Sequence, residues 1–154
     1  MSARSRRSAL GTALLLAALP ARGVAQAPRI WQADVQIQAL DLSQLDQSLV
    51  ARVVVYSDNH DEARAVHVEI LLPLGVGVTR TAMGCSASLS PPGVSELRAR
   101  VMCDMGTLPV RTSREVFVIT TLPAAGIPKT FGVFVSSDTP DPRPGNNFAE
   151  KTLP

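Results

Sequence analysis

The chain has 154 residues, with 15 lysines and arginines against 13 acidic residues, and this length suffices for one domain with a buried core. Four of the basic residues lie among the first 25, so the remainder carries 11 basic and 13 acidic side chains. The basic residues are scattered, and no aromatic side chains alternate with them, which excludes a nucleic-acid-binding surface.

The first segment, residues 1–25, is predicted to be a secretory signal peptide. Arg4, Arg6 and Arg7 form a basic start. The mainly apolar run Leu10–Leu19 follows, and it is too short to span a bilayer, which needs about 20 apolar residues. We therefore expect export to the periplasm or secretion.

The end of the signal leaves two cleavage positions open. Cleavage after Ala25 is favoured over cleavage after Ala27, because Pro28 follows the second bond. The stretch Ser5–Leu10 also resembles a twin-arginine signal, so both export routes stay open. No cysteine lies at the cleavage region, so we expect no lipid anchor, and residues 26–32 are expected to form a short leading segment.

Beyond this segment the polarity of the chain alternates with a period of two, which predicts β-strands. Val35, Ile37 and Ala39, for example, are expected to share one face of the first strand. Short strands without helical periodicity predict a two-sheet antiparallel β-sandwich over residues 33–154. The expected strands are 34–40, 49–57, 66–70, 76–83, 97–104, 115–121, 130–136 and 147–153.

The two cysteines, Cys85 and Cys103, are predicted to form a disulfide, since an exported chain enters an oxidising compartment. Residues of the same parity beside each cysteine are apolar, so both cysteines are expected on buried faces. Pro91–Gly93 lies midway between them, and a hairpin there sets the cysteines opposite each other at a Cα separation of ~5.5–6 Å. Closing this loop is expected to contribute roughly 3 kcal/mol to stability.

Several motifs, taken in order, resemble the bacterial surface repeat known as domain of unknown function number eleven. The resemblance implies an immunoglobulin-like β-sandwich without known chemistry, often found in tandem in adhesin-like and cell-wall proteins. The matching motifs are Ala33-Asp34-Val35, Leu71–Val76, Cys85-Ser86-Ala87, Val101–Leu108, Ser136–Pro142 and Asn146-Asn147.

The chain departs from this pattern in two respects. Members of the family usually carry Asn-Gly after the second strand, whereas this chain reads Ser57–Glu62 there. We also expect one copy without an anchor, and a single unanchored copy does not fit the usual role of a stalk or spacer repeat.

A proline-rich stretch near the end supplies candidate metal ligands. Asp138, Asp141, Asn146 and Asn147 offer the oxygen atoms that Ca²⁺ prefers. The regular spacing of a calcium-binding loop is absent, and a turn fixed by proline and capped by Asp and Asn side chains also explains these residues. We favour the turn and retain calcium as the alternative.

Other possible sites have ordinary structural explanations. The polar run Asp58–Glu62 is favoured as a solvated turn, because neighbouring turn residues rarely converge on one ion. Met83, Met102 and Met105 lie near the cysteines, where core packing is favoured over copper binding. His67 is expected to face solvent.

Catalytic and carbohydrate-binding patterns find little support. No nucleophile-elbow motif occurs, and two histidines do not allow a triad to be nominated. A carbohydrate platform needs several aromatic faces, whereas the chain offers Trp31, Tyr56 and four phenylalanines. Trp31 is expected to cover one end of the sandwich.

Together these observations predict a non-enzymatic, exported binding or structural module of the bacterial cell envelope, with no cofactor. Its partner would be another envelope protein or a copy of itself, contacted through protein surfaces such as an exposed edge strand. The alternative is a periplasmic domain that binds a small ligand or calcium through residues 138–147.

Overall fold

The computed structural model describes residues 29–58, 61–89 and 99–154, and it confirms the all-β prediction. The predicted signal peptide and the turn Pro91–Gly93 lie outside the described residues. The described part contains nine strands and one short 3-10 turn, η1 (Pro144–Asn146). The strands are β1 (Asp34–Leu45), β2 (Ser48–Asp58), β3 (Ala63–Leu71), β4 (Val78–Thr81), β5 (Cys85–Leu89), β6 (Ala99–Leu108), β7 (Thr112–Thr121), β8 (Lys129–Ser136) and β9 (Phe148–Leu153).

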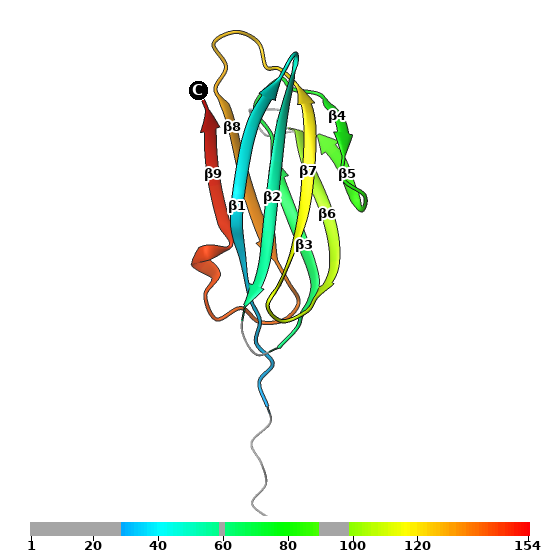
Figure 1. Cartoon of the computed structure of the whole chain (residues 1–154), viewed down its shortest axis with the longest axis vertical. Coiled ribbons are helices and arrows are strands. Elements are labelled where there is room, and N and C mark those ends of the chain that lie inside the picture. The colour runs from blue at the N-terminus through cyan, green and yellow to red at the C-terminus, as the bar shows by residue number, and fades with distance from the viewer. Residues whose placement is uncertain (1–28, 59–60, 90–98) are drawn as a thin grey trace, which may run out of the picture.

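The strands form two antiparallel sheets packed face to face, so the predicted β-sandwich is confirmed (Figure 1). One sheet has the order β1-β2-β7-β4 and the other β5-β6-β3-β8-β9. An immunoglobulin sandwich places its strands A, B, E and D in one sheet and C, F and G in the other. The spatial order here matches that arrangement, with the antiparallel pair β5–β6 added beside β3, although β4 in the D position precedes this pair along the chain.

The core lies between the sheets and is built from the inward-facing residues of both. Val53 and Val55 face it from β2, and Val68 and Ile70 face it from β3, all fully buried. The burial pattern confirms the alternation predicted for 66–70, although the register with β6 shifts between Val66 and His67. It also confirms the alternation over 99–104, and residues 97 and 98 lie outside the described residues.

The first strand differs from the expectation. A bulge between Ile37 and Ala39 adds one residue to β1 relative to β2, and this reverses the alternation beyond it. Val35 and Leu40 are therefore buried, whereas Ala39 does not share the face of Val35. The strand then continues to a tight turn at Asp46, whose φ is 49°.

The shorter strands lie at sheet edges. The run predicted at 76–83 is reduced to the four residues of β4, which form an edge of the four-stranded sheet as expected. β5 was not predicted as a strand of its own, because Cys85–Leu89 contains no β-branched residue.

The chain enters and leaves the sandwich at opposite ends of its long axis (Figure 1). Residues 29–33 approach at the end where β1 begins, and β9 runs to the other end, where the carboxyl terminus lies. Among the described residues there is no helix of the length and hydrophobicity that crossing a membrane requires.

Candidate functional site

A row of side chains crosses the outer face of the five-stranded sheet, and we call it the five-strand row. The strand registers place its members side by side in the order Phe148, Phe134, Glu69, Met102 and Ser86. Phe148, Phe134 and Met102 are 47%, 43% and 38% exposed. The row therefore presents three large apolar side chains to solvent, separated by one carboxylate.

The two phenylalanines of this row pack against each other. Their ring centroids lie 4.6 Å apart and the ring planes are inclined by 35°. Phe148 also leans over Gly132, where a Cβ atom would lie 3.8 Å from its ring and 3.7 Å from Leu71. Because the rings face one another, they form an apolar ridge, which differs from the coplanar platform expected of a carbohydrate site.

An ion pair lies at the middle of the same face. Arg100 Nη1 is 3.2 Å from Glu69 Oε1, and the two side chains are 37% and 30% exposed. Arg100 Nε is buried and has no acceptor among the described residues. This side chain thus keeps one hydrogen-bond donor that the described residues do not satisfy.

The disulfide predicted from the sequence joins Cys85 to Cys103 across β5 and β6. Their Cα atoms are 3.9 Å apart, closer than expected. The adjacent residues Asp104 and Gly84 form the hydrogen-bonded pair, with N···O 2.9 Å, so the cysteines occupy the narrower non-hydrogen-bonded position. The bond lies within one sheet, whereas antibody domains link their two sheets, and it fastens the edge strand that carries Ser86.

The methionines near the disulfide have different environments. Met105 is 5% exposed and belongs to the core, Met102 lies in the five-strand row, and Met83 is 99% exposed. Core packing therefore explains Met105 and is wrong for Met83 and Met102. His67 is half-buried on the outer face, beside Asp104 in the strand register.

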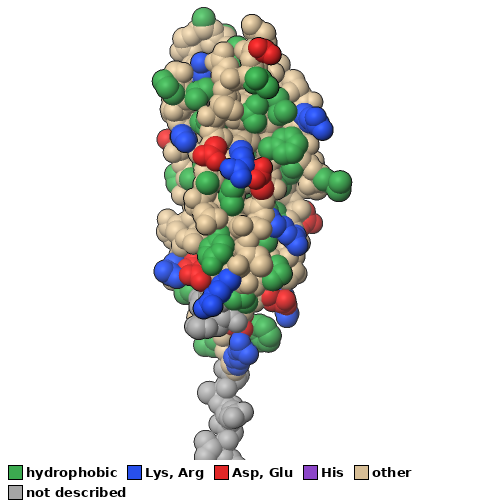
Figure 2. Space-filling view, viewed as in Figure 1, with side chains coloured by type: hydrophobic (Ala, Val, Ile, Leu, Met, Phe, Trp, Pro, Cys, Tyr) green, Lys and Arg blue, Asp and Glu red, His purple; other side chains and the backbone are tan. Residues whose placement is uncertain are grey.

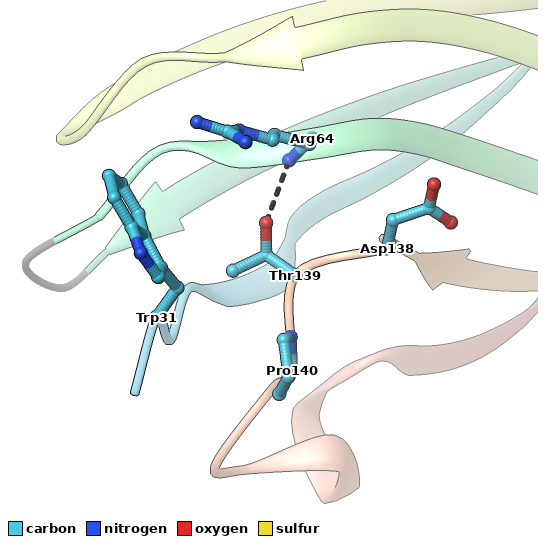
Figure 3. A pocket seen from close by; sticks show the side chains of 5 residues that line it. All are labelled: Trp31, Arg64, Asp138, Thr139 and Pro140. Atoms are coloured by element: carbon cyan, nitrogen blue, oxygen red, sulfur yellow. Dashed lines mark hydrogen bonds between the residues drawn. The ribbon is translucent and has the colours of Figure 1, made fainter. Parts of the chain in front are cut away.

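The candidate calcium ligands separate into two places. Asp141, Asn146 and Asn147 lie against the start of β1, where Asp141 accepts hydrogen bonds from the backbone N–H of Val35 and from Asn147. The amide oxygens Oδ1 of Asn146 and Asn147 are buried without a donor. Asp138 instead lines a pocket beside Trp31 (Figure 3).

A buried carboxylate that the sequence analysis did not single out completes this loop. Asp34 is 1% exposed, and its partners are Arg143 Nη2 at 2.6 Å and the amide nitrogen of Asn146 at 2.9 Å. Its charge is therefore neutralised within the chain. Among the described residues, no group of three or more His, Cys, Asp or Glu side chains is arranged to hold a metal ion.

The predicted solvated turn at Asp58–Glu62 is wrong for one residue. Asp61 is 5% exposed and accepts hydrogen bonds from the backbone N–H of Gln32 and from the Arg29 guanidinium. It thereby holds the leading segment against the sandwich. Asn59 and His60 lie outside the described residues.

Trp31 lies at the end of the sandwich, as predicted, and is 48% exposed. The guanidinium carbons of Arg29 and Arg64 are each 5.0 Å from the centre of its ring, within range of a cation–π interaction. Trp31, Arg64 and Asp138 line a cavity of about 330 Å³, and their side chains are drawn in Figure 3. Two guanidinium groups thus already lie over the ring of Trp31, although the residue stays about as exposed as Phe148.

The outer face of the four-stranded sheet carries a charged cluster at its middle (Figure 2). Arg52 lies 3.1 Å from Asp41 and 2.6 Å from Glu115. The hydrogen bond from Arg52 lowers the pKa of Glu115, and the bond to Glu115 raises the pKa of Arg52. The exposed ion cluster keeps this face hydrated.

Comparison with known proteins yields similarity of shape alone. No family model matches the chain, and no curated protein matches it. The chitin-binding domain of Chi18aC from Streptomyces coelicolor is 13% identical with a TM-score of 0.43, over 72% of this chain and 95% of that domain. A family 3b carbohydrate-binding module from Clostridium clariflavum is 10% identical with a TM-score of 0.42, over 71% and 93% of the two chains.

Sequence reasoning missed the five-strand row because its members come from five strands. The alternation in 97–104 puts Met102 on the face opposite Cys103, and the structure likewise puts Phe134 on the face opposite Val133 and Val135. Those parities mark both residues as outward-facing, but only the register shows that they share one row.

Proposed function

We propose that this chain is an exported, non-enzymatic binding module of the bacterial cell envelope that acts through protein–protein contacts at the five-strand row. The observation that carries the proposal is the exposure of Phe134, Phe148 and Met102 in one row. Grouped exposed apolar side chains are a feature of interaction surfaces, where aromatic residues, Met and Arg are enriched.

The proposal includes the export signal and the domain boundaries inferred from sequence. Residues 1–25 are removed as the signal peptide, 26–32 form the leading segment, and 33–154 form the domain. The disulfide between Cys85 and Cys103 supports an oxidising location such as the periplasm. Membership in the family of unknown function number eleven rests on the motifs quoted above and on the immunoglobulin-like strand order.

Affinity capture from envelope extract tests the proposed function. The purified chain should retain a defined set of envelope proteins, identified by mass spectrometry. The double variant Phe134→Ser with Phe148→Ser should retain at least about tenfold less, because two large contacts are lost. The matched control is Leu45→Ser, which removes a 65% exposed side chain from the other sheet. Equal capture by the double variant and the parent would overturn the proposal.

A second candidate function is binding of calcium or a small ligand by the loop 138–147. The buried, donor-free amide oxygens of Asn146 and Asn147 favour it, because such oxygens are suitable Ca²⁺ ligands. The existing ion pair between Asp34 and Arg143 opposes it.

Thermal unfolding tests this alternative. Calcium at 5 mM should raise the Tm of the parent relative to chelator, by mass action on the folded state. The increase should disappear in Asn147→Ala, and magnesium at the same concentration serves as the ionic-strength control. An equal Tm in calcium and chelator would exclude a calcium site.

A further inference from the structure

The five-stranded sheet can pack against a second copy of itself about a central axis. Its strand order is β5-β6-β3-β8-β9, so β3 has two strands on each side. Rotating a second copy by half a turn about an axis along β3 sets β6 over β8 and β5 over β9. The same surface then serves both copies, as a two-fold interface requires.

The apolar members of the five-strand row match under this rotation. Phe134 and Met102 lie one strand to either side of Glu69, so Phe134 of each copy meets Met102 of the other. Sulfur–aromatic contacts of this kind are favourable. Phe148 likewise meets Ser86, a small side chain that leaves room for the ring. The contact would cover all three exposed apolar side chains.

The charges at the centre also match. Glu69 lies on the axis strand and Arg100 on the next strand, so the rotation gathers two carboxylates and two guanidinium groups in one cluster. The Arg100 side chain is 37% exposed, so its guanidinium group can meet the carboxylates of this cluster. Arg100 also faces Gly132 of the other copy, which lies beneath the Leu71 and Phe148 side chains of that copy.

From this complementarity we propose that the partner of the five-strand row is a second copy of the chain, packed face to face through the five-stranded sheets. The inference rests on the proposed function and names its partner. Five strands at ~4.8 Å spacing give a face about 20 Å wide, and we estimate that each copy would bury roughly 500 Å² of it. A standard interface buries more, about 800 Å² per partner. The dimer is therefore weak and is half-formed at roughly 10⁻⁴ M.

Sedimentation velocity over about 5 to 500 µM tests the dimer. The parent chain should pass from monomer to dimer as its concentration rises. Phe134→Ser with Phe148→Ser should weaken the dimer at least about tenfold. Leu45→Ser should leave it unchanged, since Leu45 lies in the other sheet.

A charge exchange separates contacts between copies from those within one copy. Glu69→Arg alone gathers four positive charges at the axis, and Arg100→Glu alone gathers four negative charges, so each variant should be monomeric. An equimolar mixture should form a heterodimer, because each charge then meets its opposite across the axis. Circular dichroism would verify that both variants are folded.

The outcomes distinguish this inference from the proposed function. A parent chain that stays monomeric at 500 µM, or a mixture that forms no heterodimer, overturns the second-copy partner. A monomeric chain that still captures envelope proteins through Phe134 and Phe148 retains the proposed function with a different partner. A parent chain that neither associates with itself nor captures any envelope protein overturns both.

Discussion

The outer faces of the two sheets differ in the pairing of their charged side chains and in the apolar side chains that they expose. On the four-stranded sheet, Arg52 contacts two carboxylates, and the charged cluster occupies the middle of the face. On the five-stranded sheet, Arg100 contacts one carboxylate and keeps a buried donor without an acceptor. That sheet also exposes Phe134, Phe148 and Met102, which the other face does not match among its described residues.

The difference arises from cross-strand pairing. Arg52 lies directly opposite Asp41 in the register, so opposite charges meet and hold water around the face. Phe134 instead lies opposite Phe148, which joins two apolar side chains into one ridge. Strands with similar alternation can therefore form either a charged outer face or an apolar one, depending on which residues meet across strands.

The largest expected effect comes from the covalent link that only the five-stranded sheet possesses among the described residues. Cys103→Ser should lower the Tm by roughly 10 °C, because about 3 kcal/mol of loop-closure stabilisation is lost. Differential scanning calorimetry without reductant measures this change. Cys85→Ser should give the same shift, and the double variant should add nothing. Equal melting of variant and parent would show that the disulfide is not structural.

A smaller loss is expected at a glycine beside the disulfide. Gly84 has φ of +80°, and a Cβ atom there would lie 2.9 Å from the carbonyl oxygen of Asp104. Gly84→Ala should therefore lower the Tm by about 5 °C. Gly132→Ala is the control, since its new Cβ would meet neighbours only at 3.7 and 3.8 Å. If both alanine variants melt together, backbone conformation at Gly84 does not limit this sheet.

The contrast between the faces can also be reversed. Arg52→Leu with Glu115→Leu removes most of the charged cluster and adds leucine beside Phe117, the cross-strand partner of Arg52. Introduced into the Phe134→Ser, Phe148→Ser background, these changes should restore concentration-dependent association, with a Tm change within about 3 °C. Sedimentation velocity measures the association. A chain that remains monomeric would show that exposed apolar area alone does not make a face adhesive.

The smallest effect concerns the ion pair itself. The pKa of Glu115 is lowered from its usual 4.5, so its pairing with Arg52 stabilises the fold above that pH and the benefit is lost as pH falls through the lowered pKa. Glu115→Gln should lower the Tm slightly at pH 7, by about 1 °C, since the pair is half-exposed. The difference from the parent should shrink as the pH falls below 4.5 and through the lowered pKa, and it should also shrink in 1 M salt. A difference that changes with neither pH nor salt would exclude the ion pair as its cause.

The extent to which the sequence predicts the fold depends on strand regularity. Alternation placed Val68 and Val101 in the core because β3 and β6 pair regularly there. The predicted alternation failed beyond Ile37, because the bulge inserts one residue into β1 and nothing in the polar–apolar pattern marks the insertion. The opposition of Cys85 and Cys103 was predictable because the turn-forming residues Pro91–Gly93 stand midway between them in the sequence.

The candidate surface was less predictable than the fold. Parity identifies Phe134 and Met102 as outward-facing, but their proximity depends on strand order, and β3 between them is distant in sequence. The role of Asp61 was also hidden, because a buried acid and a solvated one look alike in a polar run. Its partner, the backbone N–H of Gln32, has no sequence signature at all.

The described chain enters and leaves the sandwich at opposite ends, and this matters for immobilising the protein on a solid support. Because the chain enters beside Trp31 and leaves at the far end of β9, attachment through residue 154 holds the Trp31 pocket away from the support. Twelve residues of β1 set that separation at roughly 40 Å. The outer face of the five-stranded sheet then stands upright, parallel to the attachment axis, where neighbouring molecules on a crowded support can meet it sideways.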